Sequence, residues 1–300
     1  MDDAIDIVVN PYTPEIVALR PSWSRSFFGE KIGVSATTLA GISIDAFLEK
    51  MDRAGIAHAL LVATKAGPAW HPTSFRLPYE KVAELVARYP DRFSGLAGID
   101  PTEGMTGVRQ LEWAVKELGF VGAHLYPHWF ELPPDHARYY PFYAKCCELN
   151  VPIQIQVGNC LRYSADRPLR SVGRPITLDA VACDFPELKI VGIHIGWPWT
   201  EEMIAMAYKH PNVYIGSDAY APKHWDPALV RYIDSWGQEK VLFGTDFPVI
   251  DPERARAEID QLGLRPEPKR KFLRDNAVKL YQLEGKLQSR LAAPPAQPTA

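Results

Sequence analysis

Two residues of the sequence stand where they could carry acid–base or metal chemistry. Asp246 follows the apolar run 240–243, and His194 ends the apolar run 189–194. A carboxylate and an imidazole at the ends of buried strands can hold a metal ion or exchange protons with a substrate. A metal site of this kind normally takes further histidines, but the first apolar run ends at Asn10 and contains none. The pair therefore favours acid–base chemistry, with Asp246 as general base and His194 polarising a carbonyl or moving the proton.

Further polar side chains lie at or just after the ends of other apolar runs. Asn10 and Gln156 carry neutral amides, which orient a substrate or a water but bind metals weakly. His124 ends another run, although a histidine in that place can also be a packing residue with satisfied hydrogen bonds. The predicted substrate-binding residues are Asn10, Tyr12, Gln156, His124, Tyr126, His128, Trp197 and Arg162.

Tryptophan placement predicts an aromatic cleft. Six of the eight tryptophans fall between a predicted strand and the next predicted helix: Trp23, Trp70, Trp129, Trp197, Trp199 and Trp225. In barrels of alternating strands and helices these loops carry function, so the tryptophans indicate a water-poor pocket. Packing over the barrel top or a protein–protein surface would use the same residues.

Cationic side chains in the same loops predict a small anionic substrate. They are Lys65, Arg162, Arg174 and Lys223. A guanidinium group can bind a carboxylate through two parallel hydrogen bonds. Most loop arginines are only solvated, so the prediction rests on the set rather than on one member.

The elements that must position these residues alternate along the chain. Short apolar runs rich in Val, Ile, Leu and Ala predict strands at 4–9, 58–63, 93–99, 121–125, 152–157, 189–194, 212–215 and 240–243. Amphipathic stretches predict helices at 44–54, 79–89, 105–118, 138–149, 177–185, 200–209, 226–236 and 252–262. Eight strand–helix units are the arithmetic of a (β/α)₈ TIM barrel.

Composition and boundaries complete this outline. We expect one barrel domain over residues 1–284, with an insertion at about 10–42 over the barrel mouth and a disordered Pro/Ala-rich tail at 285–300. A net charge of −3 argues against a nucleic-acid partner, and no apolar run approaches the ~20 residues of a membrane span. The four cysteines show neither zinc spacing nor a disulfide framework, so we expect a cytoplasmic protein.

Several motifs give the chain a family resemblance. IDIVVNPYTPE, PIQIQVGN, IVGIHIGWPW and VLFGTDFP resemble the amidohydrolase-related family, in the branch of aminocarboxymuconate-semialdehyde decarboxylase and γ-resorcylate decarboxylase. The resemblance extends from Ile5 to about Tyr281. It implies an amidohydrolase-like barrel and an assembly of two or more copies.

The resemblance also assigns roles to individual positions. The family usually carries H-x-H on strand one, a metal-binding His on strand five, a catalytic His on strand six and a metal-binding Asp on strand eight. Here Val8, Asn10 and Gln156 stand at the first three positions, and only His194 and Asp246 match. The usual zinc site is incomplete, so the resemblance implies a metal-independent member without a cofactor, comparable in chemistry to pyrone-dicarboxylate lactonase.

The function expected from these observations is hydrolysis of a small aromatic-derived or ring-fission carboxylate or lactone by Asp246 and His194. Two alternatives remain. One is a metal-dependent non-oxidative decarboxylase, in which one divalent ion, zinc or manganese, is held by Asp246, His194 and a rearranged ligand such as His124. The other is a non-catalytic barrel that binds a ligand or a partner.

Overall fold

A computed structural model describes residues 3–291 of the chain. Its main sheet contains eight parallel strands, each hydrogen-bonded to the next along the sheet. In spatial order they are β1 (Ala4–Val9), β2 (Ile56–Ala63), β5 (Phe93–Gly98), β6 (Gly122–Leu125), β7 (Ile153–Gln156), β8 (Ile190–Ile193), β9 (Val213–Gly216) and β10 (Val241–Leu242). Nearly every strand residue is buried, as expected for strands covered on both faces.

The last strand returns to the first and closes the barrel. The amide of Ile7 donates to Phe243 O at 3.0 Å, and the amide of Asp246 donates to Val8 O at 2.9 Å. A parallel bridge joins Val9 to Phe247 beyond the regular strands. The predicted (β/α)₈ fold is therefore confirmed, with strand ends that differ from the predicted ones by at most two residues.

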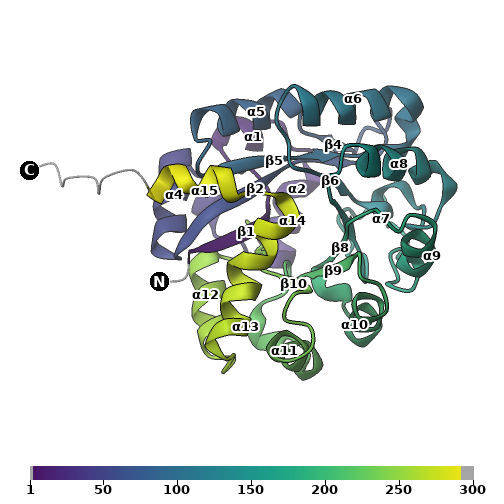
Figure 1. Ribbon diagram of the computed structural model, residues 1–300. Helices are drawn as coiled ribbons and strands as arrows, with labels where there is room; N and C mark the ends of the chain where they lie inside the picture. The colour runs from purple at the N-terminus through teal and green to yellow at the C-terminus, as the bar shows by residue number, and fades with distance from the viewer. Residues whose placement is uncertain (1–2, 292–300) are drawn as a thin grey trace, which may run out of the picture.

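Helices form a ring outside the strands (Figure 1). The helices that alternate with strands are α4 (Ile44–Arg53), α5 (Tyr79–Arg88), α6 (Gly104–Lys116), α8 (Tyr140–Glu148), α9 (Thr177–Asp184), α10 (Thr200–Lys209), α11 (Pro227–Asp234) and α12 (Pro252–Asp260). Side-chain caps fix several starts: Ser43 accepts from the amide of Ala46 before α4, and Asp251 accepts from the amides of Glu253 and Arg254 at α12. Helices α13 (Pro266–Arg270) and α14 (Asn276–Tyr281) follow the last strand.

The segment between β1 and α4 folds into short turns of helix. They are α1 (Pro14–Val17), α2 (Trp23–Ser26), a π-helical turn at Phe27–Ile32 and α3 (Ala36–Leu39). This segment, predicted as an insertion at about residues 10–42, contributes Arg20, Trp23, Phe27, Phe28 and Ile32 to the lining of the main cavity. A second small ribbon pairs β3 (Lys65–Ala66) with β4 (Phe75–Arg76) after β2.

The structure corrects part of the predicted tail. Residues expected to be disordered from position 285 form helix α15 (Glu284–Leu291) instead. The helix is attached to the barrel because Leu287 is buried and Lys286 Nζ donates to Ser94 Oγ at 3.0 Å, at the amino-terminal end of β5. The rest of the predicted tail lies outside the described residues. Within residues 3–291, no helix has the length and apolar character required to cross a bilayer.

Candidate active site

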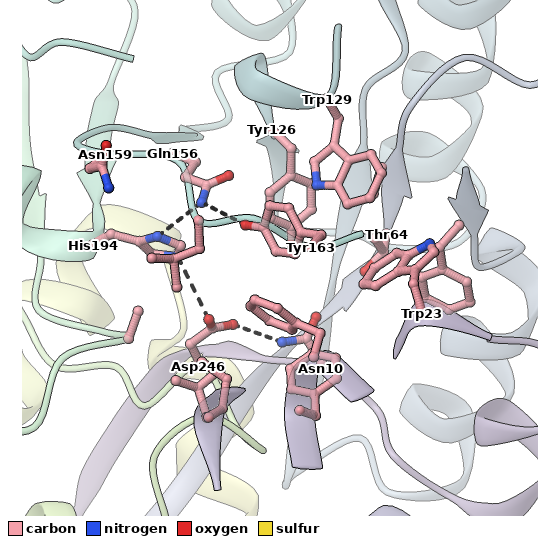
Figure 2. A pocket seen from close by; sticks show the side chains of 18 of the residues that line it. Asn10, Trp23, Thr64, Tyr126, Trp129, Gln156, Asn159, Tyr163, His194 and Asp246 are labelled. Carbon is pink, nitrogen blue, oxygen red and sulfur yellow. Dashed lines mark hydrogen bonds and ion pairs between the residues drawn. The ribbon is translucent and has the colours of Figure 1, made fainter. Parts of the chain in front are cut away.

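A cavity of about 300 Å³ opens at the carboxyl ends of the barrel strands (Figure 2). Residues that end a strand or follow it line the cavity: Asn10 after β1, Thr64 after β2, Tyr126 after β6, Gln156 in β7, His194 after β8, Ala219 after β9 and Asp246 after β10. This edge of a TIM barrel carries the active site in characterised enzymes. The cavity is therefore the candidate active site.

The two predicted catalytic residues meet a second carboxyl group, that of Asp218, at the base of this cavity. His194 Nε2 lies 3.7 Å from Asp246 Oδ2 and 3.3 Å from Asp218 Oδ2. Asp218 is fully buried, and its Oδ1 accepts a hydrogen bond from the backbone amide of His194 at 3.1 Å. The result is an imidazole placed between two carboxyl groups that come from the ends of β9 and β10.

The backbone at this cluster is strained. Positive φ angles occur at His194 (70°), Ile195 (50°), Ala219 (69°) and Asp246 (54°). Such conformations are unusual for residues other than glycine, above all for a β-branched residue such as Ile195, and they gather at functional sites. Here they turn the chain sharply after three strands, so that the side chains of His194 and Asp246 face the cavity.

Two neutral amides hold the cluster from either side. Asn10 Nδ2 donates to Asp246 Oδ1 at 2.7 Å. Gln156 Nε2 donates to His194 Nδ1 at 3.1 Å and lies 3.4 Å from the hydroxyl of Tyr163. With the amide in this orientation, Nδ1 accepts and the ring proton of His194 resides on Nε2, directed at the carboxyl groups. Figure 2 shows this chain of contacts from Gln156 through His194 and Asp246 to Asn10.

Burial controls the protonation states of the cluster. It raises the pKa of Asp218 to about 7, even though the hydrogen bond from the amide of His194 opposes the rise. Burial and the negative charge of Asp218 raise the pKa of Asp246 well above its usual value. Burial also lowers the pKa of His194 to about 3. The imidazole is therefore neutral near neutral pH, and the two carboxyl groups do not both ionise easily.

Aromatic rings form one wall of the cavity. Trp23, Trp129 and Tyr163 are in mutual contact, with ring centroids 4.9 to 5.7 Å apart. Phe27 packs on Tyr163 at 4.5 Å. Such a wall excludes water and offers faces on which a planar ring can stack.

Four of the predicted substrate-binding residues line this cavity: Asn10, Tyr126, Gln156 and Trp197. Their sequence signal was a polar or aromatic side chain at or just after the end of a strand. Three of the six loop tryptophans also reach it, namely Trp23, Trp129 and Trp197. Of the others, Trp70 is exposed, Trp225 packs on Phe272, and Trp199 lies under the guanidinium of Arg174.

The other four predicted residues are not brought to the cavity wall. His124 is fully buried inside the barrel, where its Nδ1 bonds to Gln154 Oε1 at 2.8 Å. His128 is also fully buried, and its Nδ1 accepts from the amide of Val172. Tyr12 packs beneath Arg20 and Phe28, and the exposed Arg162 donates to the backbone carbonyl of Ala165 at 2.8 Å. These side chains support the wall or the surface rather than the cavity.

The cationic residues predicted to bind the substrate are occupied elsewhere. Lys65 pairs with Glu103 at 2.6 Å and Arg174 with Glu202 at 3.0 Å, while Lys223 is exposed and absent from the lining. The structure reveals lining or cluster residues that were not predicted from the sequence, among them Arg20, Tyr163 and Asp218. Of these three, Asp218 had a usable signal, because it closely follows a buried strand.

Three atoms of the acid cluster can serve as ligands for a divalent cation. His194 Nε2, an oxygen of Asp218 and an oxygen of Asp246 lie within 4.8 Å of one another. Nε2 and Asp218 Oδ2 are buried without a hydrogen-bond partner among the described residues. One imidazole nitrogen and two carboxylate oxygens suit ions such as Mn²⁺ or Zn²⁺. These residues therefore fit a cation.

Binding of a cation would require one local change. The ring proton of His194 would move to Nδ1, and Gln156 would turn its Oε1, which has no partner now among residues 3–291, toward that proton. The cation would lie at β8, β9 and β10, and Asp218 takes the place considered for His124. The expected lack of a metal loses its main support, because that expectation did not count Asp218.

Comparisons with known proteins agree with this fold. A model of the amidohydrolase family matches residues 35–283, which is most of the chain. The chain belongs to the amidohydrolase family. This amidohydrolase is 26% identical to 2-keto-4-carboxy-3-hexenedioate hydratase from Sphingobium sp., over 70% of this chain and 72% of the hydratase. It is 25% identical to gamma-resorcylate decarboxylase from Polaromonas sp., over 67% of this chain and 74% of that enzyme.

A solved structure has the same fold. It is a dihydroxybenzoic acid decarboxylase from Polaromonas sp. with bound manganese and the inhibitor 2-nitroresorcinol, and it superposes with a TM-score of 0.69 at 21% identity, covering 94% of this chain and 98% of that one. The amidohydrolase is thus an enzyme of hydrolase or decarboxylase type, related to decarboxylases of aromatic acids. The alternative of a non-catalytic barrel has no support from these relatives.

Proposed function

We propose that this amidohydrolase is a carbon–carbon lyase that removes CO₂ from a small aromatic carboxylate without oxidation. The observation that carries the proposal is the cluster of His194, Asp218 and Asp246 at the base of an aromatic cavity of about 300 Å³. That volume suits a substrate with one ring. The relatives named gamma-resorcylate decarboxylase support the same reaction class.

The aromatic wall positions the ring of the substrate. Stacking on Trp129 and Tyr163 would hold the ring above the cluster and exclude water from it. Water exclusion favours loss of CO₂, because a desolvated carboxylate is destabilised relative to the neutral product.

The buried acids supply the proton that replaces CO₂. The O–H bond at Asp246 Oδ2 breaks as a C–H bond forms at the ring carbon that bears the carboxylate. The bond from that carbon to the carboxylate then breaks, its electron pair returns to the ring, and CO₂ leaves. Solvent restores the proton to Asp246. The raised pKa of Asp246, caused by burial and by Asp218, keeps a proton available near neutral pH.

Neighbouring groups keep this carboxyl group in place. Asn10 holds Oδ1 of Asp246, and the Nε2 proton of His194 faces Oδ2. A divalent cation held by His194, Asp218 and Asp246 would displace the proton of Asp246 and supply positive charge that binds the substrate's oxygen atoms, and in that form the proton that replaces CO₂ would come from solvent. Manganese in the dihydroxybenzoic acid decarboxylase supports this possibility, which was already one of the alternatives drawn from the sequence.

Hydrolysis of a lactone or ester, the first expectation from the sequence, is the second candidate. The 3.7 Å contact between His194 and Asp246 could activate a water as well as deliver a proton. The Sphingobium relative is a hydratase, which also adds water. Decarboxylation takes precedence because the related decarboxylases, unlike that hydratase, act on aromatic acids that match the aromatic wall.

The test is a panel of hydroxybenzoates and small lactones, incubated with the protein before and after chelation and after addition of manganese. We expect CO₂ and the decarboxylated arene from at least one acid, with one deuterium at the vacated carbon in D₂O. Asp246→Asn should reduce this rate at least about 100-fold. Turnover of lactones alone would overturn the decarboxylase proposal.

The assembly of two or more copies stays a prediction, which light scattering would measure.

A further inference from the structure

Arg20 is the cationic side chain that lines the cavity in the described part of the chain. It follows α1, where its amide donates to Val17 O at 3.0 Å. Its guanidinium carbon lies 4.6 Å from the ring centre of Tyr12, 4.6 Å from that of Phe75 and 5.3 Å from that of Phe28. Three aromatic faces therefore surround the group and hold it in place.

The guanidinium of Arg20 is partly buried and lacks a counter-anion among the described residues. Its Nε is buried without a hydrogen-bond partner among residues 3–291, and no ion pair there includes Arg20. Asp246 lines the same cavity and interacts with Arg20 electrostatically, yet its Oδ1 is bound by Asn10. Burial lowers the pKa of Arg20, and the aromatic rings offer no acceptor in the plane of the guanidinium. A partly buried cation with free donors is stabilised by an anion that enters the cavity.

Other basic residues near the cavity do not compete for this role. Arg167 donates to Trp129 O at 3.2 Å, lies over the Trp129 ring and is not in the lining. Arg170 pairs with Glu131 at 3.4 Å and is largely exposed. Arg20 therefore supplies the positive charge in the cavity lining, and the acid cluster supplies the carboxyl groups.

We infer that Arg20 binds a carboxylate group of the substrate and thereby selects aromatic acids over neutral aromatic compounds. The inference rests on the proposed function for the nature of the substrate, but the binding itself needs no turnover. The planar guanidinium accepts a carboxylate side by side, with two parallel hydrogen bonds, while Tyr12, Phe28 and Phe75 keep its plane fixed. A neutral amide of the same shape can satisfy only part of this arrangement and gains no charge attraction.

A purely structural role is the competing explanation. Arg20 could simply tie the segment that follows β1 to Phe75 on β4 through contacts with the rings. Under that explanation, removal of the guanidinium would lower the melting temperature but would not change which ligands bind.

The experiment compares benzoate with benzamide, its neutral isostere, by isothermal titration calorimetry with the full chain. We expect the wild-type protein to bind benzoate at least about tenfold more tightly than benzamide. In Arg20→Met this preference should fall to within about twofold while benzamide affinity stays unchanged, and Arg20→Lys should keep part of it. Arg25→Met is the matched control, because Arg25 lies on the same segment, is exposed and does not line the cavity.

Each outcome decides one point. An unchanged preference in a folded Arg20→Met variant would overturn the inference, as would a preference that disappears on chelation of metal and ignores Arg20. Preference lost in Arg20→Met, without CO₂ release from any aromatic acid, would support the inference and count against the proposed reaction. CO₂ release with a benzoate preference independent of Arg20 would support the proposed reaction and count against the inference.

Discussion

Asn10 Nδ2 lies 2.7 Å from Oδ1 of Asp246 and 3.1 Å from the backbone oxygen of Phe247, the next residue. The amide of Asn10 thereby joins the end of the first strand to the proposed acid. It occupies one oxygen of Asp246 and leaves Oδ2 directed at His194. In the proposed mechanism, a residue that the resemblance places at a lost metal-ligand position thus serves as a positioning residue.

Replacement of Asn10 should slow the reaction without unfolding the protein. Asn10→Ala removes the hydrogen bond to Asp246, which becomes charged as it gives up its proton, and we expect kcat to fall about 10- to 100-fold, the usual value of a hydrogen bond to a charged group. Steady-state kinetics on the best acid of the panel would measure it. A change in KM alone, with kcat unaffected, would contradict the positioning role.

Metal binding should depend on Asp218. After chelation and reloading, we expect the wild-type protein to retain about one manganese ion per chain, as measured by elemental analysis, because three donor atoms converge there. Asp218→Asn should lose most of this metal. Asp179→Asn serves as control, because Asp179, Cys183 and His210 form a second group of possible metal ligands away from the proposed site. This variant should keep the manganese content of the wild type. Equal metal content in wild type and Asp218→Asn would contradict the site.

The orientation of the Gln156 amide should control cation affinity. In Gln156→Glu the carboxylate would accept a proton from His194 Nδ1, which leaves Nε2 free as a ligand. We expect manganese affinity to rise at least about tenfold relative to wild type, measured by electron paramagnetic resonance titration. Gln156→Leu, which offers neither donor nor acceptor, should not show the rise.

Stability should fall in mild acid because several buried histidines stay neutral. At the amino-terminal end of the barrel, His58 donates from Nδ1 to Asp91 O, and its Nε2 accepts from Ser94 Oγ, which in turn accepts from Lys286. Burial lowers the pKa of His58 to about 4, from 6.5. Below pH 6.5 the unfolded chain binds a proton that the folded chain does not, so stability decreases as pH falls from about 6.5 to about 4.

The size of this effect can be isolated with one variant. His58 should account for about 2 kcal/mol of the stability lost between pH 7 and pH 5. Urea unfolding at both pH values would show that the difference shrinks by about this amount in His58→Gln. The buried His124 and His128, with pKa lowered to about 3 and about 4, should maintain the remaining pH dependence. A pH difference unaffected by the substitution would contradict the assignment.

Asp6 should be a structural support of the site rather than part of its chemistry. Its two oxygens accept hydrogen bonds from the amides of Val8 and Thr245 and from the hydroxyl of Thr245. Asp6→Ala would leave buried donors without partners, at a cost of about 2 to 4 kcal/mol in the free energy of unfolding. It would also release the residue next to Asp246, so kcat should fall. Thr245→Val, which removes only the hydroxyl, should show a smaller loss in both urea unfolding and kinetics.

The strands could be predicted because their residues are buried on both faces, which leaves continuous apolar runs. The direction of a polar side chain beyond a strand could not be predicted in the same way. Asp100 and Asp218 both follow a strand closely and are fully buried. Yet Asp100 pairs with Arg76 at 2.6 Å outside the cavity, whereas Asp218 faces His194. Only closure of the barrel distinguishes the two.

The depth of a side chain inside the barrel explains why His124 was predicted to bind substrate but does not reach the cavity. His124 and Tyr126 lie two residues apart and share a side of the chain, but His124 bonds to Gln154 in the interior while Tyr126 lines the cavity. The sequence indicates which side of the chain a residue faces, but not how deep in the barrel its side chain lies. Arg20 was not predicted as a site residue for another reason. It belongs to a segment without helix or strand periodicity, and only the fold brings Tyr12, Phe28 and Phe75 around it.

The bonds that close the barrel join β1 to residues made more than 230 positions later, as in the contact of Asp246 N with Val8 O. During synthesis on the ribosome, β1 can therefore pair with the segment that closes the barrel only after nearly the whole chain has emerged. Asn10 meets Asp246 in that same late step. A nascent chain that stops before residue 246 can contain most of the barrel's strands and helices, yet it has neither a closed wall nor the proposed acid.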